Sequence, residues 1–303
     1  MNRVVRAAAI FFFWSLVVIG CEAETGSQSS LISGSISVGN LTRTYLLNLP
    51  PDYAKTSHAL VLVLHGAGGS AEQCERDYGW TSKSTASQFI VVYPEGVPGD
   101  RPLKLRTWNA GRCCDYASQM DIDDVRFISE LIDLLASRYL VDRTRIFVTG
   151  ISNGAMMAYR LACEIPEKIA AIASVSGPLM TAQPCNPSRS VPVLHIHSEL
   201  DTKVPYAGGR GLFGYTFSSA DSTLNVWVSL NHCRDLVPVV TQKDLYTVSQ
   251  WNTCDQVIQS YLTKDGGHSW PGGLKPRAKA DSPSQGFNAT DLIWEFFKEH
   301  QLL

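Results

Sequence analysis

Apolar strands alternate with helix-like segments along most of this 303-residue chain. The runs ALVLVL at 59–64 and FIVVY at 89–93 show no polar alternation, which is typical of strands covered on both faces. Residues 121–139 have apolar side chains at helical spacing and acidic residues in the first turn. The alternation predicts an α/β fold with a mostly parallel central sheet and helices on both faces.

The composition is that of a globular protein with a sizeable core. Hydrophobic residues make up 45% of the chain and charged residues 18%, which excludes a disordered chain. The net charge is −2, so no basic excess is available to hold a phosphate backbone, and we expect no nucleic-acid partner. The strand and helix pattern continues without a linker, so residues 32–303 are predicted to form a single domain.

The N-terminus has the pattern of an export signal. Arg3 and Arg6 precede an apolar run at 7–20, which suits a signal peptide and is short for a membrane span. We expect a signal peptide over 1–21 and a flexible tether over 22–31. The run VIGC resembles a lipobox that would lipidate Cys21, whereas the small residues at 21–23 suit ordinary signal peptidase. The protein is therefore expected to be secreted, or periplasmic or anchored at the cell envelope through a lipid on Cys21, its only expected contact with a membrane.

The eight cysteines agree with export, because an oxidising compartment allows disulfides. Two local pairs are expected, Cys163–Cys185 and Cys233–Cys254. Each would close a loop of about 20 residues, worth about 3 kcal/mol in the chain-entropy model. Cys74 is expected to pair with Cys113 or Cys114. The cysteine and histidine spacing does not support a structural zinc site.

A G-x-S-x-G motif at 150–154 follows the apolar strand RIFVT and opens the helical segment NGAMMAYRLACE. This strand–turn–helix setting is that of a nucleophile elbow, in which glycines make room beside the serine. It predicts that Ser152 is a nucleophile and that the Asn153 amide, at a helix N-terminus, stabilises an oxyanion.

A serine nucleophile needs a base, and the base needs a carboxylate to orient it. In this fold the chain order is serine, acid, histidine. Asp201 follows the strand VPVLHIHS and is the predicted acid, with Glu199 as the second choice. His268 is the predicted base because the loop GGHSWPGG gives it flexible flanks, whereas His232 and His300 lie on helices.

The loop HGAGG at 65–69 follows an early buried strand and is the predicted second half of the oxyanion hole. Glycines let its backbone approach a substrate oxygen, and the Ala67 amide is the expected donor. We expect His65 to be a buried structural ring. The predicted mechanism needs no metal and no organic cofactor.

Two other classes of protein compete with this interpretation. His195, His197, Glu199 and Asp201 alternate along one strand, so they would share a face and could hold a divalent metal of a metal-dependent hydrolase. The alternative without a metal is that both histidines fill the end of the strand. A non-catalytic binding protein on the same fold is the other class, and the intact order of the three catalytic residue types argues against it.

Six segments occur in an order that resembles a known family. They are HGAGGSAEQ, the loop from Trp108 to Cys114, DIDDVRFISELID, GISNGAMMAYRLACE, HIHSELDTKVPYAGG and GGHSWPGG. Together they resemble the extracellular polyhydroxybutyrate depolymerase and feruloyl esterase family, close to carbohydrate esterase family 1, with the α/β-hydrolase fold. The resemblance implies a secreted serine esterase with Ser152, Asp201 and His268 as its triad, and it also supports the two local disulfides.

The resemblance implies substrates that are esters of a polymer or its oligomers: poly(3-hydroxybutyrate), feruloyl esters of plant polysaccharide, or acetylated xylan. A serine peptidase or an acyltransferase with the same triad is the alternative. Trp108, Tyr206 and Trp270 are candidates for the lining of the substrate cleft, although core packing would explain each equally well.

Overall fold

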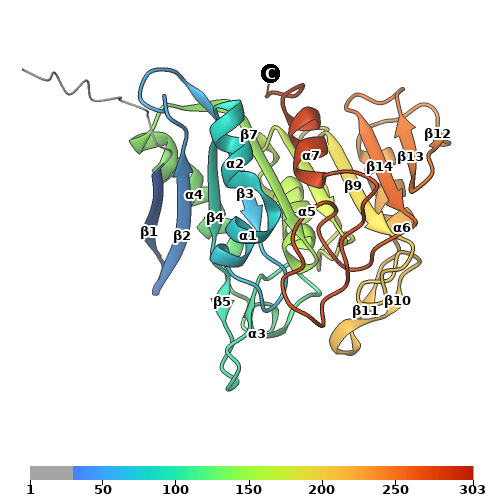
Figure 1. Ribbon diagram of the computed structural model, residues 1–303, viewed down its shortest axis with the longest axis horizontal. Helices are drawn as coiled ribbons and strands as arrows, with labels where there is room; N and C mark the ends of the chain where they lie inside the picture. The colour runs from blue at the N-terminus through green and yellow to red at the C-terminus, as the bar shows by residue number, and fades with distance from the viewer. Residues whose placement is uncertain (1–29, 303) are drawn as a thin grey trace, which may run out of the picture.

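The computed structural model describes residues 30–302, so the predicted signal peptide lies outside the described residues. A ten-stranded sheet runs through the molecule in the order β1-β2-β4-β3-β7-β8-β9-β14-β13-β12 (Figure 1). Its first strand begins at Ser30, so the last two residues assigned to the tether belong to the sheet.

The six central strands are parallel, and both flanks are antiparallel. The parallel strands are β4 (Ile90–Pro94), β3 (His58–Leu64), β7 (Val141–Ile151), β8 (Ala171–Val175), β9 (Val193–Ser198) and β14 (Ile258–Thr263). The flanking strands are β1 (Ser30–Val38), β2 (Leu41–Leu49), β13 (Tyr246–Trp251) and β12 (Val239–Gln242). All seven residues of β3 are buried, as its unbroken apolar sequence predicts.

Helices cover both faces of the sheet, so the predicted fold is confirmed. One face carries α4 (Asp124–Arg138), α5 (Asn153–Glu164) and α6 (Ala220–Leu230), and the other carries α1 (Ala71–Tyr78), α2 (Trp80–Ser87) and α7 (Ala289–Phe297). Each face has its own core: Phe127, Met157 and Trp227 lie in the first, and Trp80, Trp270 and Phe297 in the second. Among residues 30–302, no helix is long and apolar enough to cross a membrane.

Side-chain caps set where the helices begin. The Asp123 carboxylate accepts a hydrogen bond from the Arg126 amide, so α4 starts at Asp124, three residues after the predicted start. Asn288 caps α7 as predicted, by accepting from the Asp291 amide.

Short elements near the loops were not predicted. The expected loop 94–120 contains β5 (Val97–Pro98), β6 (Arg106–Thr107) and α3 (Asp115–Gln119). The segment after β9 contains the pair β10 (Gly209–Arg210) and β11 (Thr216–Phe217). Two 3-10 turns, η1 (Pro166–Lys168) and η2 (Leu212–Gly214), complete the chain. Two-residue strands and single helical turns are too short to show a periodic sequence pattern.

The structure contains both local disulfides, Cys163–Cys185 and Cys233–Cys254. The expected pairing of Cys74 is wrong, because the adjacent Cys113 and Cys114 are joined to each other. Among residues 30–302, Cys74 is the cysteine outside a disulfide. Its side chain lies on the inner face of α1 and is fully buried, which keeps it away from the loop that carries the other two. Burial raises the pKa of this thiol well above its usual value.

Candidate active site

Ser152 sits at the sharp turn between β7 and α5. Its backbone has φ 57° and ψ −122°, a conformation that a non-glycine residue adopts only when the surrounding structure imposes it. The Ser152 amide donates to the Val175 carbonyl at 2.8 Å, which fixes the turn to β8. A Cβ atom on Gly150 would lie 2.7 Å from the Leu64 carbonyl oxygen, so the neighbouring backbone leaves no room for a side chain there.

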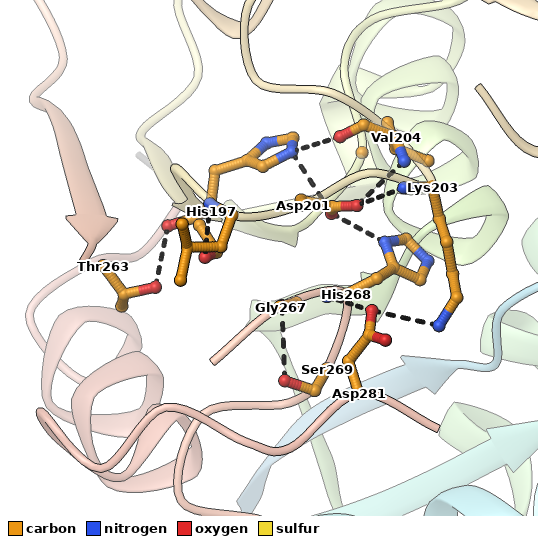
Figure 2. A network of polar contacts seen from close by, with 12 residues as sticks. His197, Asp201, Lys203, Val204, Thr263, Gly267, His268, Ser269 and Asp281 are labelled. Atoms are coloured by element: carbon orange, nitrogen blue, oxygen red, sulfur yellow. Dashed lines mark hydrogen bonds and ion pairs between the residues drawn. The ribbon is translucent and has the colours of Figure 1, made fainter. Parts of the chain in front are cut away.

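Asp201 and His268 meet where β9 and β14 end, as Figure 2 shows. His268 Nδ1 lies 2.7 Å from Asp201 Oδ2. The other carboxylate oxygen, Oδ1, accepts from the backbone amides of Lys203 and Val204, both at 2.9 Å. Burial alone would raise the pKa of Asp201, but hydrogen bonds from His197 and His268 outweigh it, and the pKa lies well below its usual value. The carboxylate therefore stays ionised beside the imidazole.

A second carboxylate holds the loop of His268. The Asp281 Oδ2 atom accepts from the His268 backbone amide at 2.9 Å and lies 3.0 Å from Lys203 Nζ (Figure 2). Burial opposes ionisation of Asp281, but these two partners prevail and lower its pKa. Because the Lys203 amide donates to Asp201, the residues Asp201, His268, Asp281 and Lys203 form a closed circuit of contacts, which we call the His268 network. Neither Asp281 nor Lys203 could be recognised as a site residue from the sequence.

Ser152 and His268 line the same cavity, which has a volume of about 500 Å³. We call it the catalytic cavity. It brings together the segments that hold the predicted nucleophile, base and oxyanion loop, since Gly66, Ala67, Gly68 and Gly69 also line it.

The loop 65–69 is anchored by its own hydrogen bonds. The Gly68 amide donates to the Arg106 carbonyl at 2.8 Å and the Gly69 amide to the Gly66 carbonyl at 2.9 Å. Among residues 30–302, neither the Ala67 amide nor the Asn153 amide has an acceptor. Ala67 lines the catalytic cavity, so its amide is available to a ligand oxygen, whereas Asn153 is fully buried next to the cavity-lining Ser152.

His65 is buried and structural, as expected. Its Nε2 accepts from the Gly96 amide at 2.9 Å, and its Nδ1 lies 2.8 Å from the Gly66 carbonyl oxygen. Its carbonyl accepts from Trp108 Nε1 at 2.9 Å. These contacts of His65 hold the loop 65–69 in place.

The three aromatic candidates for the cleft lie elsewhere, so that expectation is wrong. Trp108 is fully buried, and the Asn153 side chain both accepts from its amide, at 2.7 Å, and donates to its carbonyl, at 3.0 Å. Trp270 stacks on Tyr78 in the core, with ring centroids 4.5 Å apart. Tyr206 packs edge-on against His197 and donates to Asp221. The buried Trp108 and Trp270 each donate the indole N–H to an acceptor inside the protein, the His65 carbonyl and the Thr290 hydroxyl, and the sequence does not show these acceptors.

The apolar part of the catalytic cavity comes from side chains outside the predicted triad and the loop 65–69. They are Tyr78, Leu103, Leu105, Ile151, Leu212, Phe213 and Pro276. Lys203 and Arg277 add positive charge to its wall. Leu212 and Phe213 belong to the segment 206–217, whose aromatic and glycine-rich composition is typical of a loop that shapes an acyl pocket.

The two strand histidines are occupied by protein partners. His195 bonds the Tyr159 hydroxyl at 2.9 Å and His197 at 3.1 Å, and His197 Nε2 donates to the Val204 carbonyl at 2.7 Å. Within the part of the chain that the structure describes, no three His, Cys, Asp or Glu side chains group as metal ligands.

Comparison with known proteins identifies the family. The profile of the family described as Phospholipase/Carboxylesterase matches residues 52–251. Feruloyl esterase C of Emericella nidulans is 26% identical over 282 residues, which cover 90% of this chain and 89% of that protein. A bifunctional acetylxylan esterase/xylanase of Neocallimastix patriciarum is 27% identical over 251 residues, 82% of this chain and 32% of that longer protein. Poly(3-hydroxyalkanoate) depolymerase C of Paucimonas lemoignei is 29% identical over 122 residues, 39% of this chain and 27% of that protein.

The fold is shared with solved esterases. An acetyl xylan esterase from Aspergillus awamori superimposes with a TM-score of 0.62 at 16% identity, covering 88% of this chain and 99% of that one. The resemblance drawn from the motifs is thereby confirmed at the level of family and fold. The chain belongs to the phospholipase/carboxylesterase family and is an esterase with the α/β-hydrolase fold.

Proposed function

We propose that the protein is a secreted serine esterase that cleaves carboxylic esters of a polymer or its oligomers, with Ser152 as nucleophile, His268 as base and Asp201 as orienting acid. The observation that carries the proposal is the 2.7 Å contact between His268 and a buried Asp201 at a cavity that Ser152 also lines. Nucleophile, base and carboxylate thus follow the ends of three parallel strands of the central sheet, β7, β14 and β9 respectively.

The first half of the reaction forms an acyl-enzyme. His268 Nε2 takes the proton of the Ser152 hydroxyl as its oxygen attacks the ester carbonyl carbon. The Ala67 and Asn153 amides donate to the oxyanion that develops on the carbonyl oxygen. Asp201 holds the imidazole through Nδ1 and stabilises its positive charge. His268 then gives its proton to the leaving alcohol oxygen as the C–O bond breaks.

The second half releases the acid. Water loses a proton to His268 and adds to the acyl carbon, the same amides hold the oxyanion, and Ser152 leaves with the proton that His268 returns. This chain's own residues supply every group that these steps use.

Sequence relatives support an ester in a plant cell-wall polysaccharide or a polyester as the substrate. They carry the names feruloyl esterase, acetylxylan esterase and poly(3-hydroxyalkanoate) depolymerase. The Cys163–Cys185 and Cys233–Cys254 disulfides support an oxidising compartment outside the cytosol.

The first test is the variant Ser152→Ala, assayed with p-nitrophenyl acetate, methyl ferulate and a soluble 3-hydroxybutyrate trimer. Removing the nucleophile is expected to lower kcat by about a thousandfold or more on every ester that the unchanged protein cleaves. Ser222→Ala, which changes an exposed hydroxyl on α6, is the matched control and is expected to leave kcat unchanged. Retention of the full rate by Ser152→Ala would rule out the proposed nucleophile.

A further inference from the structure

A second cavity, of about 640 Å³, lies beside the catalytic cavity. We call it the side pocket. Its walls come from the loop between β5 and β6, from α3, and from the turn between β10 and β11, all of which lie at the lower edge of the molecule in Figure 1.

The two cavities are adjacent, because Leu103, Leu105 and Phe213 line both of them. Leu103 is 80% exposed and Phe213 is 61% exposed. Covering large exposed apolar side chains with a ligand removes them from water, which favours binding. A ligand that continues from the catalytic cavity into the side pocket would cover both.

The side pocket is held in shape by hydrogen bonds between its walls. The Tyr215 hydroxyl accepts from the Asp115 amide at 2.8 Å, which joins the β10–β11 turn to α3. The Leu212 amide donates to the Lys203 carbonyl at 2.7 Å, which joins the same turn to the His268 network. The Gly99 amide donates to the Leu105 carbonyl at 3.0 Å and closes the third wall. A pocket fixed in this way needs little ordering when a ligand binds.

The walls define the chemistry of a ligand. Tyr116, Tyr215 and Phe213 present aromatic surface, which suits a ring or an aliphatic unit with an apolar face. Asp100, Arg101 and Gln119 add hydrogen-bonding groups that suit hydroxyl or carbonyl oxygens of the same unit. A small acyl group such as acetate would leave all of these residues without a contact.

We propose that the side pocket binds a second unit of an oligomeric ester, the unit next to the one that carries the scissile bond. The inference rests on the proposed function and adds to it that the enzyme selects for extended substrates. The shared chemistry is a unit with an apolar face and oxygen substituents. Such a unit occurs in feruloylated oligosaccharides and in 3-hydroxyalkanoate oligomers, and the experiment separates these two sources.

The test compares kcat/KM for extended and minimal substrates. Tyr116→Ala removes a wall of the side pocket, and Gln119→Trp fills it from the exposed end of α3. Neither residue lines the catalytic cavity. We expect each variant to lower, by about tenfold or more, the ratio of kcat/KM for a feruloylated trisaccharide or a 3-hydroxybutyrate trimer to that for p-nitrophenyl acetate. Val237→Ala, a matched change at an 80% exposed apolar residue outside both cavities, is expected to keep the ratio.

A fall of the ratio in one series identifies the source of the unit, and a ratio within twofold of the original value in both series would overturn the proposal. Binding is measured separately by calorimetry of the same oligomers with Ser152→Ala protein, with and without Tyr116→Ala. Weaker binding in the double variant supports the pocket even if the unchanged protein cleaves no ester, an outcome that would sink only the proposed function. Equal binding of both oligomers by both proteins contradicts the side pocket.

Discussion

Two carboxylates contact His268 at different atoms, one at its imidazole and one at its backbone amide. Asp201 binds the ring at Nδ1, whereas Asp281 binds the backbone amide of the same residue. A half-exposed ion pair such as Lys203–Asp281 contributes little to stability in itself. Its value here is geometric, because a displacement of about 1 Å at a catalytic group can cost about a hundredfold in rate.

We therefore expect Asp281→Ala to lower kcat for p-nitrophenyl acetate by about tenfold while KM changes little. Asp281→Asn keeps an acceptor for the His268 amide and is expected to recover most of the rate. Steady-state kinetics measure the effect on substrate turnover, and the rate of Ser152 phosphonylation by a fluorophosphonate measures it without turnover. Asp133→Ala removes a comparable surface partner of Lys168 far from the site and serves as the control. An unchanged kcat in Asp281→Ala would show that the His268 network does not position the imidazole of His268.

At the residue scale, chain order carried more information than residue type. Ser152, Asp201 and His268 could be selected because each follows a strand and the order of the three is that of the fold. Trp108 could not be placed in this way, because the acceptor that draws its indole into the core is the carbonyl of His65, 43 residues earlier. The predicted disulfide of Cys74 was wrong for a similar reason, because the sequence does not show that this side chain points from α1 into the sheet.

At the scale of elements, the junction of β7 and α5 depends on close contact with β3. An ideal Cβ atom on Gly150 would lie 2.7 Å from both the Leu64 carbonyl oxygen and the Gly154 carbonyl carbon. Both neighbours are backbone, so they cannot rotate away as a side chain could. The strand and the helix can therefore cross only at a residue without a side chain.

Gly150→Ala is expected to lower the free energy of unfolding by about 1–3 kcal/mol, because the extra methyl group must push strands apart. Gly99→Ala is the matched control: its Cβ atom would lie 3.4 Å from the nearest atom, the Leu105 carbonyl oxygen, which is an ordinary contact. Urea unfolding of both variants measures the difference. Equal stability of the two would contradict the packing argument.

The sequence predicted elements best where they are buried on both faces. The parallel strands β3 and β4 could be identified from apolar runs alone, and the helix at 153–164 was predicted with the bounds it has. The hairpin of β12 and β13 was missed because β12 is exposed along its length and its valines follow no alternation. Pairing with β13 forms that strand, and pairing is not visible in a single short segment.

At the scale of the whole molecule, buried neutral histidine makes stability depend on pH. Burial, and then the neighbouring His197, hold the pKa of His195 well below its usual value. The folded protein keeps His195 neutral, while the unfolded chain binds a proton as the pH falls below about 6.5. The unfolded state then carries more protons, so the free energy of unfolding falls as the pH falls.

We expect this residue to contribute a loss of up to about 1.4 kcal/mol for each pH unit below about 6.5. Urea unfolding at pH 7.5 and pH 5.5 measures the loss, and His195→Gln should reduce it. The comparison of variant with unchanged protein isolates His195 from His300, whose pKa burial also lowers. The same pH dependence in both proteins would mean that His195 plays no part.

The thiol of Cys74 lies beneath α1, fully shielded from water, and among residues 30–302 it is the cysteine that holds no covalent partner. Its sulfur can meet an alkylating reagent only when α1 separates from the sheet or the whole domain opens. The rate at which this thiol is alkylated therefore reports how often the structure around α1 opens. In a mature chain that lacks Cys21, the rate at which iodoacetamide labels the native protein would count how often this side of the fold opens, with no engineered probe.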